Sequence, residues 1–133
     1  MSRRLDDLDA RFKPLAIELI ARCAEALIPV MIVDTLRTKQ EQEANVARGV
    51  SWTMNSKHLL GLAIDICPYD VYLSNGPDKL QWDEKSPLFQ SIGKIGQALG
   101  LKWGIVLNGK HVDLGHFELV LPPATHPLDT LDI

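Results

Sequence analysis

A histidine and an aspartate stand at opposite ends of the short apolar stretch SKHLLGLAIDI, residues 56–66. Asp65 lies between Ile64 and Ile66, in a run that a folded chain would bury. A buried ionised carboxylate is costly unless it pairs with a cation or coordinates a metal. The position of Asp65 therefore predicts a partner for it, and His58 is the first candidate.

A second group of polar residues lies in HVDLGHFELV, residues 111–120. We expect His116 to open a strand on which Glu118 shares its face. Asp113 comes three residues earlier, with Gly115 between them to permit a tight turn. Two imidazoles and one carboxylate can hold zinc with a fourth position open to water, whereas nitrogen donors disfavour Ca²⁺ and Mg²⁺. His58, Asp65 and His116 are therefore candidate ligands of one zinc ion.

Each of these residues also has an ordinary structural interpretation. Asp65 could accept hydrogen bonds from the backbone or an arginine, His116 could be a satisfied strand-edge histidine, and Asp113 could close a loop. Seven residues along a straight strand would put His58 and Asp65 on opposite faces. The two converge only if His58 lies in a loop and Gly61 turns the chain.

Three further residues could support such a site. Arg37 follows a predicted strand, where its guanidinium could bind a carboxylate or stabilise an oxyanion; the alternative is a surface salt bridge with Glu41. Glu118 could orient a metal ligand or be a solvated carboxylate. Cys67 shares the face of Asp65, but a small buried thiol needs no special role.

The elements that must position these residues alternate between helical and strand patterns. Apolar stripes predict helices over 14–27 and 86–100, and a Thr38 cap with a Gly49 stop predicts a third over 38–49. Strands are expected over 30–36 and 62–67, around 101–106 and around 116–121, with a loop over 50–61 and a turn at 74–78. This mixture indicates an α+β fold with a small, mostly antiparallel sheet flanked by helices.

Length and composition indicate a single domain, residues 1–133, with a core over about 14–120 and a C-terminal tail over 121–133. The chain is 46% hydrophobic and 23% charged, with a formal net charge of −3 and scattered basic residues. This argues against nucleic acid as the main partner, and no run is long enough to insert into a membrane. Cys23 and Cys67 are expected to be reduced thiols, since no export signal is recognised and the protein is expected in the cytoplasm.

The remaining histidines and the tryptophans are given ordinary roles. His111 and His126 are expected at the surface. Core packing is the expectation for Trp52, Trp82 and Trp103, although tryptophans can also line a cleft.

SKHLLGLAIDI together with DLGHFELV resembles the zinc peptidases of the D-alanyl-D-alanine carboxypeptidase group. These share an S-x-H-x(6)-D stretch and a downstream (D/E)-x-x-H, on a hedgehog-like fold with zinc at the sheet face. Within the group, the chain looks most like phage endolysins that act as L-alanyl-D-glutamate endopeptidases. The stretch DTLRTKQEQEANVARGVSWTMNSKH supports that subgroup, and the resemblance covers roughly residues 14–120.

The resemblance implies roles for individual positions. It makes His58, Asp65 and His116 the ligands of one Zn²⁺ and Asp113 the catalytic acid/base. Arg37 would contact the substrate or transition state. Ser56 and Gln42 would be plausible hydrogen-bonding partners of the substrate.

The implied function is hydrolysis of the L-alanyl-D-glutamate bond in peptidoglycan stem peptides, leading to lysis of the host cell. The implied protein is a monomer that stays in the host cytoplasm until it is released to the wall. Two alternatives remain at this stage: a D-alanyl-D-alanine carboxypeptidase or dipeptidase, and a non-catalytic binding module stabilised by zinc.

Overall fold

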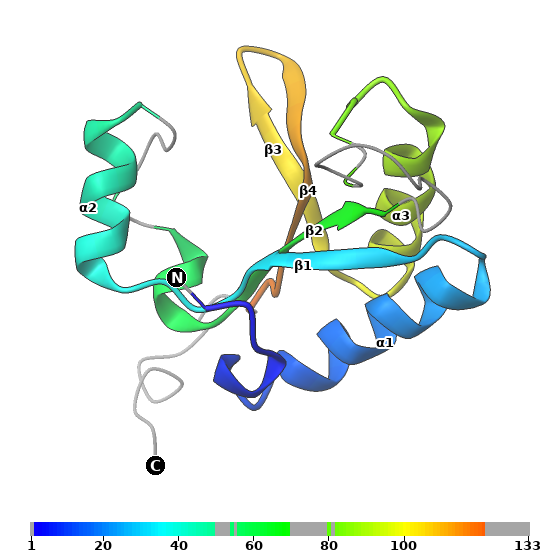
Figure 1. Ribbon diagram of the computed structural model, residues 1–133, viewed down its shortest axis with the longest axis horizontal. Coiled ribbons are helices and arrows are strands. Elements are labelled where there is room, and N and C mark those ends of the chain that lie inside the picture. The colour runs from blue at the N-terminus through cyan, green and yellow to red at the C-terminus, as the bar shows by residue number, and fades with distance from the viewer. Residues whose placement is uncertain (1, 50–53, 55, 70–79, 81, 122–133) are drawn as a thin grey trace, which may run out of the picture.

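The computed structural model describes residues 2–49, 54, 56–69, 80 and 82–121. Two 3₁₀ helices, three α-helices and four strands lie within these residues (Figure 1). In chain order they are η1 (Leu5–Asp7), α1 (Lys13–Glu25), β1 (Val30–Asp34), α2 (Lys39–Ala47), η2 (Lys57–Leu60), β2 (Ala63–Pro68), α3 (Pro87–Ala98), β3 (Lys102–Leu107) and β4 (Lys110–Glu118).

The four strands form one antiparallel sheet in the order β1-β2-β4-β3. Helices α1 and α3 contact the sheet and each other, whereas α2 stands apart beyond η2 (Figure 1). The predicted α+β class and antiparallel sheet are confirmed. The central strands β2 and β4 carry the two polar stretches that the sequence singled out, so the sheet brings them together.

The helices begin where their sequences predict. Thr38 and Glu41 form a reciprocal capping box at α2, since the Thr38 side chain accepts from the Glu41 backbone and the Glu41 side chain accepts from Thr38. Ser86 caps α3 in a similar way by accepting from the Leu88 backbone. Helix α1 ends two residues before the predicted boundary, and Leu27 beyond it has a positive φ of 63°.

Two glycines let α3 approach the sheet closely. A Cβ on Gly93 would overlap the ring of Trp103, and one on Gly96 would overlap the ring of Phe117. The rings of β3 and β4 therefore occupy the space that side chains at these helix positions would need. This contact helps close a core to which α1, α3 and the sheet all contribute.

Most predicted core residues and thiols lie where expected. Cys23 and Cys67 are buried and form no disulfide, and burial raises the pKa of the Cys23 thiol to about 11. Trp103 packs against the core with its indole N–H donating to the Leu114 carbonyl at 2.7 Å. Trp82 is half exposed and does not follow the core expectation. Trp52, His126, the turn at 74–78 and the tail at 122–133 lie outside the described residues.

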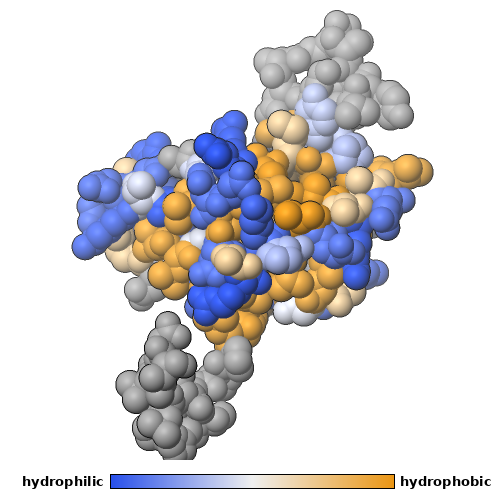
Figure 2. Space-filling model, turned by 90° about the horizontal axis from the view of Figure 1, so that it is seen from below, coloured by the Kyte–Doolittle hydropathy of each residue, from blue (hydrophilic) through white to orange (hydrophobic). Residues whose placement is uncertain are grey.

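The surface seen in Figure 2 alternates between hydrophobic and hydrophilic areas. No helix within the described ranges is long and apolar enough to cross a membrane.

Two segments differ from the prediction near the site. Residues 57–60 form the 3₁₀ helix η2 instead of part of a plain loop, and Gly61 ends it with a φ of 69°. Strand β4 begins at Lys110, so Asp113 and Gly115 lie within a strand and not in a tight turn before it. A Cβ on Gly115 would overlap the Ile66 carbonyl of β2, so this glycine permits close pairing of two strands.

Candidate functional site

The pairing of β2 with β4 places Asp65 opposite His116. Their side chains point to the same face of the sheet, and Nδ1 of His116 lies 2.8 Å from Oδ1 of Asp65. The two residues are far apart in sequence, so the contact is made only when the sheet forms. One partner of the Asp65 carboxylate is therefore the distant histidine, as the sequence suggested.

His58 reaches the same carboxylate from η2. Its Nε2 lies 3.1 Å from Oδ1 of Asp65, and its Nδ1 lies 2.6 Å from the Thr35 carbonyl. Because a carbonyl can only accept, Nδ1 must carry the hydrogen, and in the neutral ring Nε2 presents a lone pair to Asp65. This Nε2 is fully buried and has no hydrogen-bond partner among the described residues, despite its nearness to the carboxylate. Two electron-pair donors thus face each other across a short gap.

The three donor atoms fit a metal ion. They lie within 4.8 Å of one another, and the two rings are 5.2 Å apart at an interplanar angle of 64°. Neighbouring ligand atoms of a tetrahedral zinc ion lie about 3.4 Å apart, close to the two contacts that Asp65 makes. A cation between His58 and Asp65 would also remove the repulsion between their lone pairs. The group can therefore hold a metal, with His58, Asp65 and His116 as the ligands.

Two carboxylates flank the ring of His116. Its Nδ1 faces Asp65, and its Nε2 lies 3.0 Å from Oε1 of Glu118. Burial alone would lower the pKa of His116, but these two hydrogen bonds outweigh it and raise the pKa to about 10. Glu118 therefore contacts the outer nitrogen of a metal-ligand candidate, one of the two interpretations that the sequence allowed.

The charge of Asp65 is stabilised by its neighbours. Burial opposes ionisation, but the hydrogen bond with His116 and the nearness of His58 hold the pKa of Asp65 well below its usual range. The carboxylate is therefore ionised at neutral pH, as a metal ligand must be.

Asp113 lies in an irregular part of β4. The register between β3 and β4 shifts between Trp103 and Ile105, and both Gly104 and Asp113 have positive φ, of 64° and 56°. Burial raises the pKa of Asp113, and the negative charge of Asp65 raises it further. A partly buried carboxyl group with a raised pKa close to Asp65 and His116 is a candidate for proton transfer.

Arg37 is held at the end of β1 by two side chains. Its Nε donates to Oδ2 of Asp34 at 2.9 Å, with a second bond from Nη2 to the same oxygen, and its Nη1 donates to Oε1 of Gln42 at 2.5 Å. The guanidinium is mostly buried, and Nη2 lies 3.9 Å from Oδ2 of Asp65. The sequence also allowed a surface salt bridge between Arg37 and Glu41. In the structure Glu41 forms the capping box of α2, and Arg37 pairs instead with the buried Asp34.

The comparison with known families decides the classification. The family profile "Phage L-alanyl-D-glutamate peptidase" matches residues 2–120, which include the whole described site. The chain belongs to this peptidase family. A curated L-alanyl-D-glutamate peptidase of Listeria phage A118 is 37% identical over 95 residues, or 68% of this chain. The chain spans only 30% of the length of that relative.

Two solved structures share the fold of this phage peptidase family member. The Serratia marcescens L-Ala D-Glu endopeptidase ChiX has a TM-score of 0.64 and 22% identity, covering 87% of this chain and 83% of ChiX. The zinc-bound D,D-pentapeptidase VanY of a VanB-type resistance cassette has a TM-score of 0.56 and 16% identity, covering 84% of this chain and 71% of VanY. The predicted resemblance to the wider peptidase group is thereby confirmed at the level of the fold.

Ser56 and Gln42 of this family member have structural contacts that the sequence did not indicate. The Ser56 hydroxyl caps η2 by accepting from the His58 backbone at 3.2 Å. The Gln42 side chain is fully buried and contacts Arg37, so it faces the arginine and not solvent. Contact of either residue with substrate stays a prediction, and the buried position of Gln42 favours a role through Arg37.

Two other candidates lie outside the metal group. Cys67 is buried in the core, as its ordinary interpretation predicted. His111 is exposed at the surface, and its ring packs edge-on against Trp103 with Nε2 at 2.8 Å from the Trp103 carbonyl.

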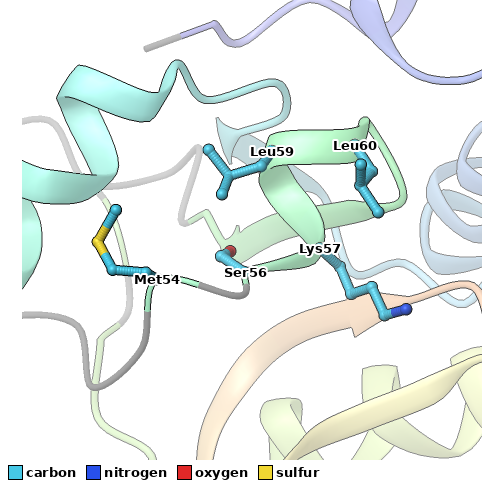
Figure 3. Close-up of a pocket in the computed structure, with 5 residues that line it drawn as sticks. All are labelled: Met54, Ser56, Lys57, Leu59 and Leu60. Carbon is cyan, nitrogen blue, oxygen red and sulfur yellow. The ribbon is translucent and has the colours of Figure 1, made fainter.

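Two hollows of this family member are lined by candidate site residues, one by Arg37 and the other by Ser56. One, of about 640 Å³, lies beside Arg37; another, of about 290 Å³, lies between Ser56 and Leu60, and the two share Met54 and Leu59. In Figure 3 the Met54 side chain stands across a gap from Leu59 and Ser56, while the Lys57 side chain extends away from them. Arg37 therefore lines the larger hollow, whereas His58, Asp65 and His116 line neither of the two.

Sequence reasoning missed three residues of the site. Asp34 holds Arg37, the Thr35 carbonyl holds His58, and the side chain of Glu84 accepts from the Leu114 backbone at 3.3 Å beside Asp113. An aspartate that ends the apolar run VMIVD was a usable signal for Asp34. Thr35 acts through its backbone, and Glu84 lies in an exposed segment, so their side-chain types gave no such signal.

Proposed function

We propose that this chain is the catalytic domain of a zinc-dependent peptidoglycan hydrolase that cleaves the L-alanyl-D-glutamate bond of the stem peptide. The carrying observation is the buried lone pair of His58 Nε2, which faces the Asp65 carboxylate beside His116. A proton or a metal ion between them would relieve the repulsion, and the convergence of His116 on the same carboxylate favours a metal ion. Family membership and the named activity of the Listeria phage relative support the choice of bond.

Zinc bound by two imidazoles and one carboxylate would lower the pKa of a water molecule and polarise the scissile carbonyl. The donor set of His58, Asp65 and His116 fits that ion. The hydrogen bonds from His58 to the Thr35 carbonyl and from His116 to Glu118 fix the direction in which each ring presents its inner nitrogen. These contacts hold the ligands in place before any metal or substrate arrives.

Asp113 is assigned the proton transfers. It would accept a proton from the attacking water and pass it to the amine nitrogen of the departing D-glutamyl residue. Burial and the charge of Asp65 already raise its pKa, which brings the carboxyl group closer to the pH at which it must both accept and donate.

Arg37 is assigned to the substrate. Arg37 lines the larger hollow. Its guanidinium carries a charge that suits the free α-carboxylate next to a γ-linked D-glutamyl residue, or the oxyanion of the transition state. The partner of this domain is thus the peptidoglycan stem peptide. A monomeric state and residence in the host cytoplasm until release to the wall stay predictions, which sedimentation and fractionation of infected cells would test.

The decisive experiment digests purified peptidoglycan with the chelator-treated protein before and after one equivalent of zinc is restored. We expect zinc-dependent appearance of D-glutamate amino termini and L-alanine carboxyl termini, identified by mass spectrometry. His58→Ala should abolish the products, and His111→Ala, which removes an exposed imidazole outside the site, should not. Release of D-alanine or D-alanyl-D-alanine would indicate the carboxypeptidase or dipeptidase alternative. Wall binding with no cleavage under any metal condition would indicate the non-catalytic alternative.

A further inference from the structure

We propose that Asp34 is a positioning residue that fixes the guanidinium of Arg37 for the substrate. The inference rests on the proposed function, because it concerns the residue assigned to the substrate. Asp34 itself is 2% exposed and is surrounded by protein, so it cannot be the group that meets a peptide. Its effect must pass through a neighbour.

The contacts of Arg37 indicate which N–H groups remain for a ligand. A guanidinium has five N–H groups, and Asp34 takes one on Nε and one on Nη2, while Gln42 takes one on Nη1. Among the described residues, this leaves one N–H on each terminal nitrogen. Two N–H groups on the terminal nitrogens are suited to a carboxylate, which binds best in a paired arrangement. Asp34 thus occupies the edge of the guanidinium formed by Nε and Nη2, and the remaining N–H groups of Nη1 and Nη2 are left for an anion.

The backbone of β1 ties this arrangement to the metal group. A register shift between Ile32 and Asp34 puts Asp34 opposite Asp65 across the β1–β2 pair. The Thr35 carbonyl then meets His58, and the Arg37 backbone N–H donates to the His58 carbonyl at 3.0 Å. One short segment therefore sets the positions of Arg37 and His58 together.

Asp34 also keeps Arg37 away from a metal ligand. Nη2 of Arg37 lies 3.9 Å from Oδ2 of Asp65, too far for a hydrogen bond. Without the Asp34 carboxylate, the long and flexible arginine side chain could close that distance and pair with Asp65. The guanidinium would then be turned toward the ligand group and away from the anion of the substrate.

The test is a double-mutant cycle on kcat/KM for a soluble stem-peptide substrate, with zinc content measured for each protein. Asp34→Asn keeps the shape of the side chain and removes its charge. We expect it to lower kcat/KM by up to about 100-fold, the size of effect produced by a misplaced binding group. If Asp34 acts through Arg37, the double variant Asp34→Asn/Arg37→Met will lose no more than Arg37→Met alone.

The matched control is Asp9→Asn. Asp9 accepts from Nε and Nη2 of Arg11 at 2.9 and 3.1 Å, a similar pairing that is exposed and includes none of the site residues. The Asp9→Asn variant should have the same kcat/KM as the unmodified protein. The inference is overturned if Asp34→Asn has the kcat/KM of the unmodified protein, or if its loss multiplies with that of Arg37→Met.

A second measurement tests the inference without an activity assay. It uses the unmodified protein, so it still applies if the Asp34→Asn variant does not fold. In the unmodified protein, the Nε–H of Arg37 should exchange with water at least about 10-fold more slowly than that of Arg11, because its partner is buried. NMR of the arginine side chains reads both rates. Equal rates would show that Asp34 does not hold the guanidinium. If the unmodified protein cleaves no peptidoglycan, the proposed function fails, while the exchange rates still decide whether Asp34 fixes Arg37.

Discussion

Nε2 of His58 and Oδ1 of Asp65 face each other at 3.1 Å, and the hydrogen of the His58 ring is on the opposite nitrogen, bonded to the Thr35 carbonyl. In the neutral ring that hydrogen orients the imidazole, and the lone pair of Nε2 points inward, toward the Asp65 carboxylate. That arrangement favours a metal ligand over the satisfied structural histidine that the sequence also allowed.

Zinc should bind with a stoichiometry of one and stabilise the fold. At a free concentration 100-fold above Kd, the free energy of unfolding should rise by about 2.7 kcal/mol, because only the folded chain presents the three ligands together. Metal analysis and thermal unfolding of chelated and reloaded protein measure both effects. His58→Ala should lose them and His111→Ala should retain them. An unfolding temperature that does not respond to zinc in the unmodified protein would contradict the prediction.

Zinc binding at neutral pH should release a proton. The pKa of His116 is raised from its usual value of 6.5 to about 10 by its hydrogen bonds with Asp65 and Glu118, so the ring carries a proton at pH 7 that a metal ligand must lose. Affinity should therefore rise with pH, by about tenfold per unit below the raised pKa. Calorimetry in buffers of different ionisation enthalpy counts the protons. A binding enthalpy that does not depend on the buffer at pH 7 would contradict this prediction.

Asp113→Asn should remove turnover and leave zinc binding intact. Asparagine tolerates the positive φ of 56° at this position, so the backbone of β4 should be preserved while the proton acceptor is lost. We expect kcat to fall by about 10²–10⁴-fold, the usual contribution of a general acid/base. Steady-state kinetics and metal content measure the two properties. Retention of kcat in a zinc-loaded Asp113→Asn protein would require a different acid/base.

Gly96→Ala should destabilise the protein even though alanine favours helices. The added Cβ would overlap the Phe117 ring, whose strand also carries His116. Overpacking of this kind costs about 1–3 kcal/mol. Urea unfolding gives the value, and Gln97→Ala at an exposed position of α3 is the control. A Gly96→Ala protein as stable as the control would show that the ring moves aside freely.

The sequence by itself determined the local elements and the chemical types of the ligands. Caps at Thr38 and Ser86 and apolar stripes are local signals, so the helices lie close to the predicted ranges. The polar residues His58, Asp65 and His116 stood out because they interrupt or border apolar runs. Gly61 was correctly expected to turn the chain between the first two.

Only the tertiary structure decided how these residues meet. Asp65 and His116, which pair across β2 and β4, are 51 residues apart in the sequence. The irregular register of β4 near Asp113 depends on the neighbouring strand β3. The burial of Gln42 and the partnership of Arg37 with Asp34 likewise follow from how the end of β1 packs. Such contacts depend on register and on backbone groups such as the Thr35 carbonyl, and the order of side-chain types along the chain does not encode either one locally.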